Sequence, residues 1–333
     1  MNAGKRLVDG YDLVIFDLDG VIYLIDHPIP GAVDAVTELH RDGTRLAYAT
    51  NNASRRAGEV ATLLTGLGVP AEAGEVLTSA GAAAAVLAER LPPGARVLVV
   101  GAEALRAEVR DAGLVPVALA DEAPVAVVQG YGPEVGWAQL AEAAVAVRAG
   151  ALWVATNTDR TLPSPRGPLP GNGSLVAVLR TALDRDPDVV VGKPEPALFA
   201  TAARLTGARR PLVVGDRLDT DIEGANRASM DSLLVLTGVS GAAELLAAPP
   251  ERRPTYVAAD LSGLFEVDDA VRVPVEAAGG WQVADGRLSG TGSALDALRL
   301  LCGVAWSGGA AGAVVPDSPA ARDAWPPLSL NPP

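Results

Sequence analysis

Histidine and cysteine are scarce in this 333-residue chain, and their scarcity excludes several kinds of catalytic site. The two histidines, His27 and His40, offer little material for a histidine-rich zinc site, a Ser-His-Asp triad or a phosphohistidine route. We expect both to be surface or loop residues. The one cysteine, Cys302, rules out an intrachain disulfide framework and lacks the arginine cradle that a cysteine-dependent phosphatase needs after its nucleophile. Cys302 is therefore expected to pack inside a helix.

Lysine is also rare, because only Lys5 and Lys193 occur among the 27 basic residues. Arginine carries a planar, permanently charged fork, whereas lysine is a compact point charge that fits a crowded phosphate and carboxylate site. In a chain that otherwise uses arginine, Lys193 indicates a position that needs an ammonium group.

Positive charge and long apolar runs are lacking too. A net charge of −13 argues against a nucleic-acid or anionic-membrane partner, since both require basic surface. No run reaches about 18 uninterrupted apolar residues, and residues 1–10 contain no apolar core of signal-peptide length. With 49% hydrophobic and 20% charged residues, the composition predicts a well-cored cytoplasmic protein. A small anionic substrate would need local positive charge or a bound metal.

Short apolar runs alternate with Ala/Leu-rich helical patterns, which is typical of βαβ units and a mostly parallel sheet. The spacing predicts strands at residues 11–16, 46–49, 189–191, 211–214 and 232–236, and a helix at 55–67. Polar motifs follow four of these strands. In an open α/β sheet the carboxyl edge is the expected ligand crevice. The fold class expected is α/β, with a doubly wound parallel sheet.

A second α/β pattern, with strands near 97–100, 125–129 and 152–155, carries none of the four motifs. We expect a catalytic core at residues 1–78 and 189–267 and an inserted α/β cap at 79–188. Within the cap, residues 156–174 form a Gly/Pro-rich loop of unusual length. A C-terminal extension at 268–333 should hold a hairpin at 281–288, a helix at 293–302 and a Pro-rich disordered tail at 316–333.

Acidic residues dominate two motifs. In Asp17-Leu18-Asp19-Gly20 two carboxylates stand at the end of a buried strand, where their charge is costly unless a cation such as Mg²⁺ compensates it. Asp17 is placed to act as a nucleophile, and Asp19 as an acid and base reached across the glycine turn. Taken alone, this turn could equally be a solvated loop. Asp216 is the natural further metal ligand, while Asp221 could order metal-bound water, hold Lys193 or cap a helix. Asp219 is expected to be a cap or a solvated residue.

Neutral and basic residues supply the other two motifs. Thr50, Asn51 and Asn52 lie at a strand-to-helix turn, which offers a hydroxyl and backbone N–H groups to a phosphate. The alternative is that Asn51, Asn52 or Ser54 simply caps the helix. Lys193 precedes Pro194, which is expected to be the first residue of a helix. Neither serine nor threonine follows Lys193, so this is not a P-loop lysine.

Together these four strings make the chain resemble the haloacid dehalogenase superfamily, specifically its NagD-like phosphatases with an α/β cap inserted after the second motif. The resemblance covers about residues 11–267 and implies a Rossmann-like core. It also implies that Asp17 is the nucleophile and Asp19 the general acid/base, and that Thr50, Asn51 and Lys193 hold phosphate. Mg²⁺ would be bound by Asp17, Asp216 and the carbonyl of Asp19.

Within that branch the chain looks most like phosphatases that act on glycerol 3-phosphate. Phosphoglycolate phosphatases and broad-specificity enzymes that hydrolyse 4-nitrophenyl phosphate are the alternatives. A dehalogenase would not need Asp19, and a phosphonate hydrolase would need a cap lysine, which is absent between Lys5 and Lys193. A binding or scaffold protein would tolerate loss of a catalytic residue, yet the set is complete. A phosphotransferase with the same intermediate stays open.

The cap must set the substrate, since the core residues touch only phosphate, metal and the scissile oxygen. We expect the long cap loop to contact the substrate, with candidates Asn157, Asp159, Arg160, Arg166 and Asn172. Asn and Asp suit a polyol, whereas Arg suits a carboxylate, so both substrates stay open. The expected partner is a small phosphorylated metabolite, together with a second copy bound through the cap.

Overall fold

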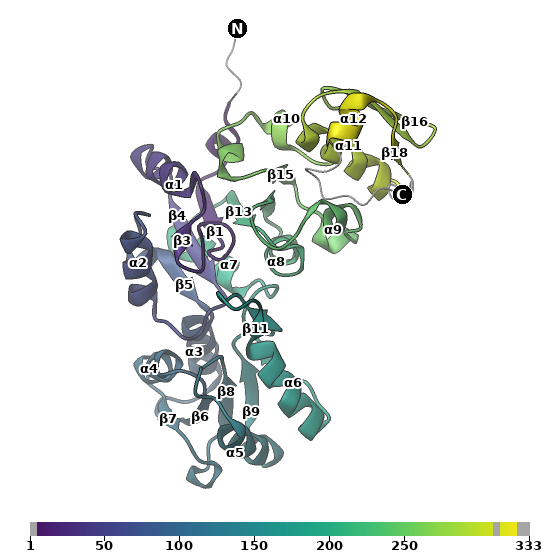
Figure 1. Ribbon diagram of the computed structural model, residues 1–333. Helices are drawn as coiled ribbons and strands as arrows, with labels where there is room; N and C mark the ends of the chain where they lie inside the picture. Colours follow the sequence, from purple (N-terminus) through teal and green to yellow (C-terminus); the bar gives the residue numbers. More distant parts are fainter. Residues whose placement is uncertain (1–4, 309–313, 325–333) are drawn as a thin grey trace. The chain divides into compact units, whose positions relative to one another are not determined.

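The computed structural model describes residues 5–308 and 314–324, which form two compact units (Figure 1). The first unit is drawn from Met1–Leu24, Pro28–Leu46 and Leu205–Pro333, and the second from Ile25–His27 and Ala47–Arg204. The first unit therefore combines the strands before the acidic motifs with the C-terminal extension. The second combines the strands before the Asn and Lys motifs with the segment predicted to be the cap.

The first unit is built on a parallel sheet with strand order β15-β14-β13-β1. These strands are β1 (Leu13–Phe16), β13 (Pro211–Gly215), β14 (Asp231–Val235) and β15 (Tyr256–Ala258). Every residue of β1 is buried, as expected for a strand covered on both faces. Because Phe16 pairs with Val214, the residues that follow β1 and β13 leave the sheet at the same edge.

Helices, short turns and one short strand complete this part of the unit. The helices are α1 (Ala32–Arg41), α8 (Glu223–Arg227) and α9 (Ala242–Leu246), and the strand is β2 (Tyr23–Leu24). The 3₁₀ turns lie at Leu7–Gly10, Pro250–Arg252 and Leu261–Leu264. A π-helical turn at Leu218–Ile222 precedes α8. The strand β3 (His27–Pro28) and the helix α7 (Ala197–Thr206) each contain residues of both units.

The C-terminal extension packs onto the sheet of the first unit. It contains α10 (Asp268–Val271), the antiparallel strands β16 (Gly280–Ala284) and β17 (Arg287–Thr291), α11 (Ala294–Trp306), β18 (Val315–Pro316) and α12 (Pro319–Ala324). The predicted hairpin and helix are thus confirmed. Leu298 and Cys302 of α11 lie in one hydrophobic cluster with Leu234 and Val257 of the sheet. Burial raises the pKa of the Cys302 thiol to about 12, consistent with the predicted packing role.

The prediction of a disordered tail from residue 316 is wrong for residues 316–324. Ser318 accepts a hydrogen bond from the Ala321 N–H at 3.1 Å, and Asp317 N–H donates to the Leu288 carbonyl at 2.8 Å. Ala321 and Ala324 are buried in the cluster that also holds Trp281 and Leu288. The two alanines thus form a buried face of α12, which the Pro-rich composition of this segment does not indicate. Residues 325–333 lie outside the described part of the chain.

The second unit contains a five-stranded parallel sheet with order β12-β9-β8-β6-β7. Its strands are β6 (Arg96–Val100), β7 (Val115–Val117), β8 (Ala126–Gln129), β9 (Leu152–Ala155) and β12 (Val189–Val190). All but β7 lie close to the ranges expected from the sequence. The strands β4 (Leu46–Thr50) and β5 (Val76–Thr78) also pair in parallel. The helices of this unit are α2 (Ala57–Gly66), α3 (Ser79–Arg90), α4 (Glu103–Asp111), α5 (Trp137–Arg148) and α6 (Asn172–Leu183), with 3₁₀ turns at Ala73–Glu75 and Ala120–Glu122.

The long loop expected at residues 156–174 contains an ordered hairpin. Strands β10 (Thr161–Leu162) and β11 (Leu169–Pro170) pair antiparallel, and α6 already begins at Asn172. Gly171 makes this possible, because a Cβ there would lie 2.5 Å from the Asp159 carbonyl oxygen. The Gly171 N–H donates to the Arg160 carbonyl at 2.9 Å. Glycine in this segment therefore permits close approach of two backbones rather than flexibility.

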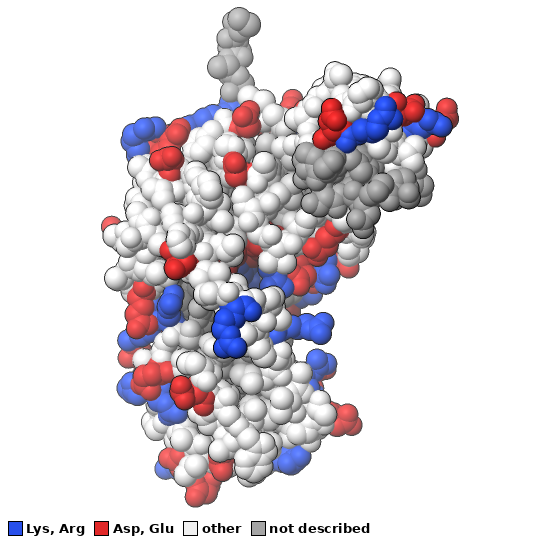
Figure 2. Space-filling view, in the orientation of Figure 1, with Lys and Arg blue, Asp and Glu red and all other residues white. Residues whose placement is uncertain are grey.

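The surface mixes charges of both signs, as the visible face in Figure 2 shows. Ion pairs account for part of this pattern; Arg6, for example, lies within 3.2 Å of carboxylate oxygens of Asp9, Glu38 and Asp42. His27 is exposed beside Asp26, as expected, while His40 is half-buried in the last turn of α1. In the part of the chain that the structure describes, no helix has the length and apolar character needed to cross a membrane.

Candidate active site

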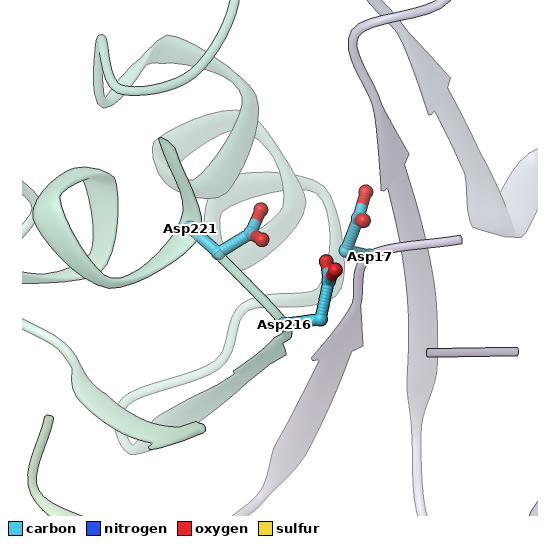
Figure 3. A group of neighbouring side chains, drawn as sticks. All are labelled: Asp17, Asp216 and Asp221. Carbon is cyan, nitrogen blue, oxygen red and sulfur yellow. The ribbon is translucent and has the colours of Figure 1, made fainter. Parts of the chain in front are cut away.

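Three buried acidic side chains meet at the carboxyl edge of the first unit's sheet. Asp17 follows β1, Asp216 follows β13, and Asp221 lies in the π-helical turn beyond β13. Each offers a carboxylate oxygen, and the three oxygens lie within 4.8 Å of one another. In Figure 3 the Asp17 and Asp216 carboxylates lie side by side and the Asp221 carboxylate points toward them. The exposed fraction of Asp17 is 8%, and that of Asp216 and Asp221 is 0%.

Two features of the β13 motif set the position of Asp221. A Cβ on Gly215 would lie 2.2 Å from the Asp221 Cβ, so the carboxylate can fold back onto the strand end only over a glycine. The Asp221 Oδ2 accepts a hydrogen bond from the N–H of Arg217, the residue before the π-helical turn, at 3.1 Å. Asp221 therefore accepts a hydrogen bond at the start of a helical turn, as the capping alternative expects, and it also belongs to the acidic cluster.

This donor set fits a small hard divalent cation. Mg²⁺ prefers carboxylate oxygens together with water and substrate phosphate oxygens. Three buried carboxylates packed this closely repel one another, and a cation between them offsets that repulsion. Gly20 and Gly238 both lie against the Asp216 carboxylate, and a Cβ on either would lie within 2.5 Å of the Asp216 Oδ2.

The remaining two acids of these motifs lie apart from the cluster. Asp19 is half-buried in the turn after Asp17, which is closed by a hydrogen bond from the Gly20 N–H to the Tyr23 carbonyl at 2.8 Å. Asp219 forms a two-pronged pair with Arg217, with N–O distances of 3.0 and 2.9 Å. Burial works to raise the pKa of Asp219, but the Arg217 guanidinium outweighs it and holds that pKa below its usual range. Asp219 is thus a paired residue outside the cluster.

In the second unit, Lys193 is buried and closely held. Its side chain is 3% exposed, and its Nζ donates to the Ala49 carbonyl at 3.0 Å. The Asn51 Oδ1 accepts from the Lys193 N–H at 2.8 Å, and the Asn51 Nδ2 donates to the Lys193 carbonyl at 3.1 Å. Asn51 thus grips the main chain of Lys193 with both ends of its amide. Gly192 permits this grip, because a Cβ there would lie 2.5 Å from the Asn51 Oδ1.

Asn51 is itself fixed by its neighbours. Its Nδ2 also donates to the Asp159 Oδ2 at 3.0 Å, so both amide hydrogens are engaged. Its carbonyl accepts from the Ser79 Oγ and from the Asn157 Nδ2, each at 2.6 Å. The Asn51 side chain therefore positions Lys193, which the sequence did not indicate.

The turn after β4 is not a helix cap. The helix α2 begins at Ala57 with Arg56 as its N-cap, so the alternative in which Asn51, Asn52 or Ser54 caps the helix is wrong. Instead, the Thr50 Oγ1 accepts from the Asn52 N–H at 3.1 Å, and the Asn52 Oδ1 accepts from the Ser54 N–H at 2.8 Å. These bonds hold an extended turn between the strand and the helix.

The prediction that Pro194 begins a helix is also wrong, since α7 begins at Ala197. The Glu195 N–H instead donates to the Gly192 carbonyl at 3.0 Å, in a turn that precedes the helix. Pro196 disfavours helical backbone at Glu195, so the helix begins only after this second proline.

The five cap candidates fall into three groups by burial. Asn157 and Asn172 are buried, and the Asn172 Nδ2 donates to the Asn157 carbonyl at 2.7 Å. Asp159 is half-buried against Asn51. Arg160 and Arg166 are exposed. The structure thus engages the amides of both asparagines with the protein's own backbone and leaves both arginines at the surface.

Several residues near the acidic cluster stand in no motif. Thr237, Gly238, Val239 and Ser240 follow β14 and contact either Asp216 or the turn after Asp17. In sequence they read only as a glycine-containing turn at a strand end, so their role could be found only from contacts between distant segments.

Comparison with known proteins identifies the family. A model of haloacid dehalogenase-like hydrolases matches residues 14–115, and a second model of such hydrolases matches residues 190–264. The D-glycerol 3-phosphate phosphatase of Mycobacterium tuberculosis is 51% identical over 279 residues, covering 84% of this chain and 77% of that protein. An acid sugar phosphatase of Staphylococcus saprophyticus is 36% identical over 261 residues, covering 77% of this chain and 97% of that protein.

Solved structures agree with these sequence relatives. The glycerol phosphate phosphatase of M. tuberculosis, in complex with magnesium, superposes with a TM-score of 0.92 at 45% identity, covering 98% of this chain and 100% of that one. A 4-nitrophenylphosphatase from Thermotoga maritima gives a TM-score of 0.72 at 30% identity, covering 78% and 98%. The α/β core with additional sheets and helices expected from the sequence is therefore confirmed, and the chain belongs to the haloacid dehalogenase-like hydrolases.

Proposed function

We propose that this protein is a Mg²⁺-dependent phosphatase that hydrolyses glycerol 3-phosphate to glycerol and phosphate. The observation that carries the reaction class is the cluster of Asp17, Asp216 and Asp221, whose oxygens lie within 4.8 Å of one another. The substrate is supported by 51% identity to a D-glycerol 3-phosphate phosphatase. Phosphoglycolate and 4-nitrophenyl phosphate remain the alternative substrates, and a related 4-nitrophenylphosphatase structure favours a test of the latter.

The first unit supplies the groups that make and break bonds. Asp17 attacks phosphorus in line, forming an aspartyl phosphate while the bond to the leaving oxygen breaks. Asp19 gives that oxygen its proton and then takes a proton from the water that hydrolyses the intermediate. Asp17, Asp216 and the Asp19 carbonyl would hold Mg²⁺, with Asp221 in support. When bound, the ion offsets the charge of these carboxylates and of the phosphate.

The second unit supplies the phosphate-binding groups. Lys193 offers a buried ammonium, and Thr50, Asn51 and Asn52 lie at the strand end where backbone N–H groups can meet an anion. Because both hydrogens of the Asn51 amide are engaged, we assign its side chain to positioning Lys193.

Substrate choice falls to the exposed cap residues. Among the five candidates, Arg160 and Arg166 keep their side chains at the surface and could contact the organic part of the substrate. Asp159, Asn157 and Asn172 would act indirectly, by holding Asn51 and the start of α6.

The domain layout follows from these roles. We propose a catalytic core at residues 1–78 and 189–267, a cap at 79–188 and a C-terminal extension from 268. We also propose a cytoplasmic location and a homodimer formed through the cap. The single buried cysteine suits a reducing compartment.

A substrate panel tests the function. Purified protein should release phosphate from glycerol 3-phosphate only with Mg²⁺ or a similar ion, and kcat/KM should exceed that for phosphoglycolate. If phosphoglycolate is preferred by tenfold or more, about 1.4 kcal/mol of transition-state preference, the runner-up substrate takes its place. Absence of turnover on every phosphomonoester in the presence of Mg²⁺ would sink the reaction class.

A further inference from the structure

Residues 237–240, which are separated from the end of β14 by one residue, contact both acidic motifs of the first unit. The Thr237 Oγ1 donates to the Gly20 carbonyl at 2.6 Å. The Val239 N–H donates to the Asp216 Oδ2 at 2.7 Å, and the Ser240 N–H donates to the Asp216 carbonyl at 3.0 Å. Residues 237–240 thus reach the turn after Asp17 and, two residues later, both the side chain and the main chain of Asp216.

Ser240 extends these contacts to the start of the π-helical turn. Its side chain is 2% exposed, and its Oγ accepts from the Leu218 N–H at 3.1 Å. The turn that begins at Leu218 also carries Asp221. Residues 237–240 are therefore connected by hydrogen bonds to the segments that carry all three carboxylates.

Gly238 shows how tightly Asp216 is enclosed. Gly238 is exposed and does not have a positive φ, so neither burial nor conformation explains a glycine there. A Cβ at this position would lie 1.9 Å from the Asp216 Oδ2, far below any van der Waals contact. A Cβ on Gly20 would lie 2.5 Å from the same oxygen and 3.2 Å from the Gly238 Cα. Two neighbouring glycines therefore lie against the Asp216 carboxylate, and the hydrogen bond from the Val239 N–H fixes its rotation.

We propose that residues 237–240 form a positioning clamp, which orients Asp216 and the turn after Asp17 for divalent-cation binding. The proposal rests on the Mg²⁺-dependent function proposed above. Mg²⁺ demands near-ideal octahedral geometry, so a small rotation of one carboxylate lowers affinity. Groups that hydrogen-bond metal ligands typically change metal affinity 10- to 100-fold when removed. Thr237 and Gly238 are thus positioning residues that act through Gly20 and Asp216.

Substitution of Gly238 by alanine gives the strongest test. The added methyl group must displace the Asp216 carboxylate, so we expect Gly238→Ala to bind Mg²⁺ at least tenfold more weakly in titration calorimetry. Gly241→Ala is the matched control, because no heavy atom lies within 4 Å of the Cβ position at Gly241. This control should bind Mg²⁺ within about twofold of wild type.

Thr237 provides a second test that does not depend on how Gly238→Ala folds. Thr237→Val keeps the shape and removes the hydroxyl, whereas Thr237→Ser keeps the hydroxyl. Valine should weaken Mg²⁺ binding severalfold and serine should restore it. A merely structural role would instead lower the unfolding midpoint without Mg²⁺ and leave the Mg²⁺ dissociation constant unchanged. The apparent KM for glycerol 3-phosphate at saturating Mg²⁺ should move little in either variant.

The outcomes separate this proposal from the function on which it rests. If wild-type protein binds no Mg²⁺ and hydrolyses no phosphomonoester, the proposed function fails. If wild type is active with Mg²⁺ while folded Gly238→Ala and Thr237→Val both bind Mg²⁺ as wild type does, only the clamp is overturned. Weakened binding in both variants, with recovery in Thr237→Ser, supports it.

Discussion

The two units bury charge in opposite ways. The first holds three carboxylates, each at the end of a strand or just beyond it. Glycines lie against two of them, where a larger residue would not fit. The second buries a single ammonium, Lys193, whose Nζ donates to the Ala49 carbonyl and whose main chain is gripped by Asn51. The buried charges of the first unit repel one another, whereas the buried charge of the second unit is stabilised by a hydrogen bond to a carbonyl.

This difference indicates two kinds of preparation for a phosphate reaction. Like charges held close are stable only beside a counter-charge, so the first unit is preformed for a cation. The buried ammonium already has carbonyl oxygen around it and is preformed to meet an anion. The two regions should consequently fail in different ways when altered.

Loss of the proposed nucleophile, Asp17, should have the largest effect. Asp17→Asn keeps the shape but cannot attack phosphorus, so kcat for glycerol 3-phosphate should fall by about a thousandfold or more. Steady-state phosphate release measures this. Asp9→Asn, which alters an exposed pair with Arg6, is the matched control and should keep wild-type turnover. Normal turnover in a folded Asp17→Asn protein would end the aspartyl-phosphate mechanism.

Replacement of the buried lysine should rank next. Lys193→Arg keeps the charge, but a planar fork cannot occupy a site that is 3% exposed and shaped for one ammonium. We expect kcat/KM to fall by about a hundredfold, or roughly 2.7 kcal/mol. The same exchange at the chain's other lysine, Lys5→Arg, is the control. Near-wild-type kcat/KM in Lys193→Arg would mean that charge alone matters in the second unit.

The sequence predicts where the charged residues of both regions lie better than it predicts the contacts that hold them in place. Strand ends and turn motifs place Asp17, Asp216 and Lys193 correctly at the ends of β1, β13 and near β12, because local apolar runs fix those elements. The support of Lys193 by Asn51 spans 142 residues, and that of Gly20 by Thr237 spans 217. No local pattern encodes such pairs.

Two further features were hidden for the same reason. The hairpin of β10 and β11 depends on Gly171 meeting the Asp159 carbonyl, and α12 depends on burial against Trp281 and Leu288. Because both segments are rich in polar or small residues, the sequence predicts a loop at the first and a disordered tail at the second. Packing against distant residues overrode that local signal.

A smaller effect should follow from loosening the grip on Lys193. Asn51→Asp removes two donated hydrogen bonds and sets a carboxylate against Asp159, so kcat/KM should fall by about 10- to 50-fold. Asn226→Asp is the control, since the Asn226 amide likewise donates two hydrogen bonds, to the carbonyls of Glu251 and Arg253 in the first unit. It should lower thermal stability without lowering kcat/KM. If Asn51→Asp behaves like Asn226→Asp, Asn51 supports only the fold.

The smallest effect is expected at Asp219, which lies between Asp216 and Asp221 in sequence but outside their cluster. Its side chain is 41% exposed and paired with Arg217, so the pair should contribute less than about 1 kcal/mol to the free energy of unfolding. Asp219→Asn should leave kcat within about twofold of wild type. A large loss of Mg²⁺ affinity would instead place Asp219 inside the metal site.

The pH dependence of that small difference has a definite sign. Arg217 holds the pKa of Asp219 below the value of 3.8 that the unfolded chain retains. The folded state therefore gains stability from the ionised carboxylate at pH values above 3.8, and loses that gain as the pH falls through the lower folded pKa. The unfolding midpoints of wild type and Asp219→Asn, measured by calorimetry, should differ most near pH 6 and converge in acid. If Asp219→Asn is instead the more stable of the two proteins near pH 6, repulsion from the neighbouring carboxylates, rather than the pair with Arg217, governs Asp219.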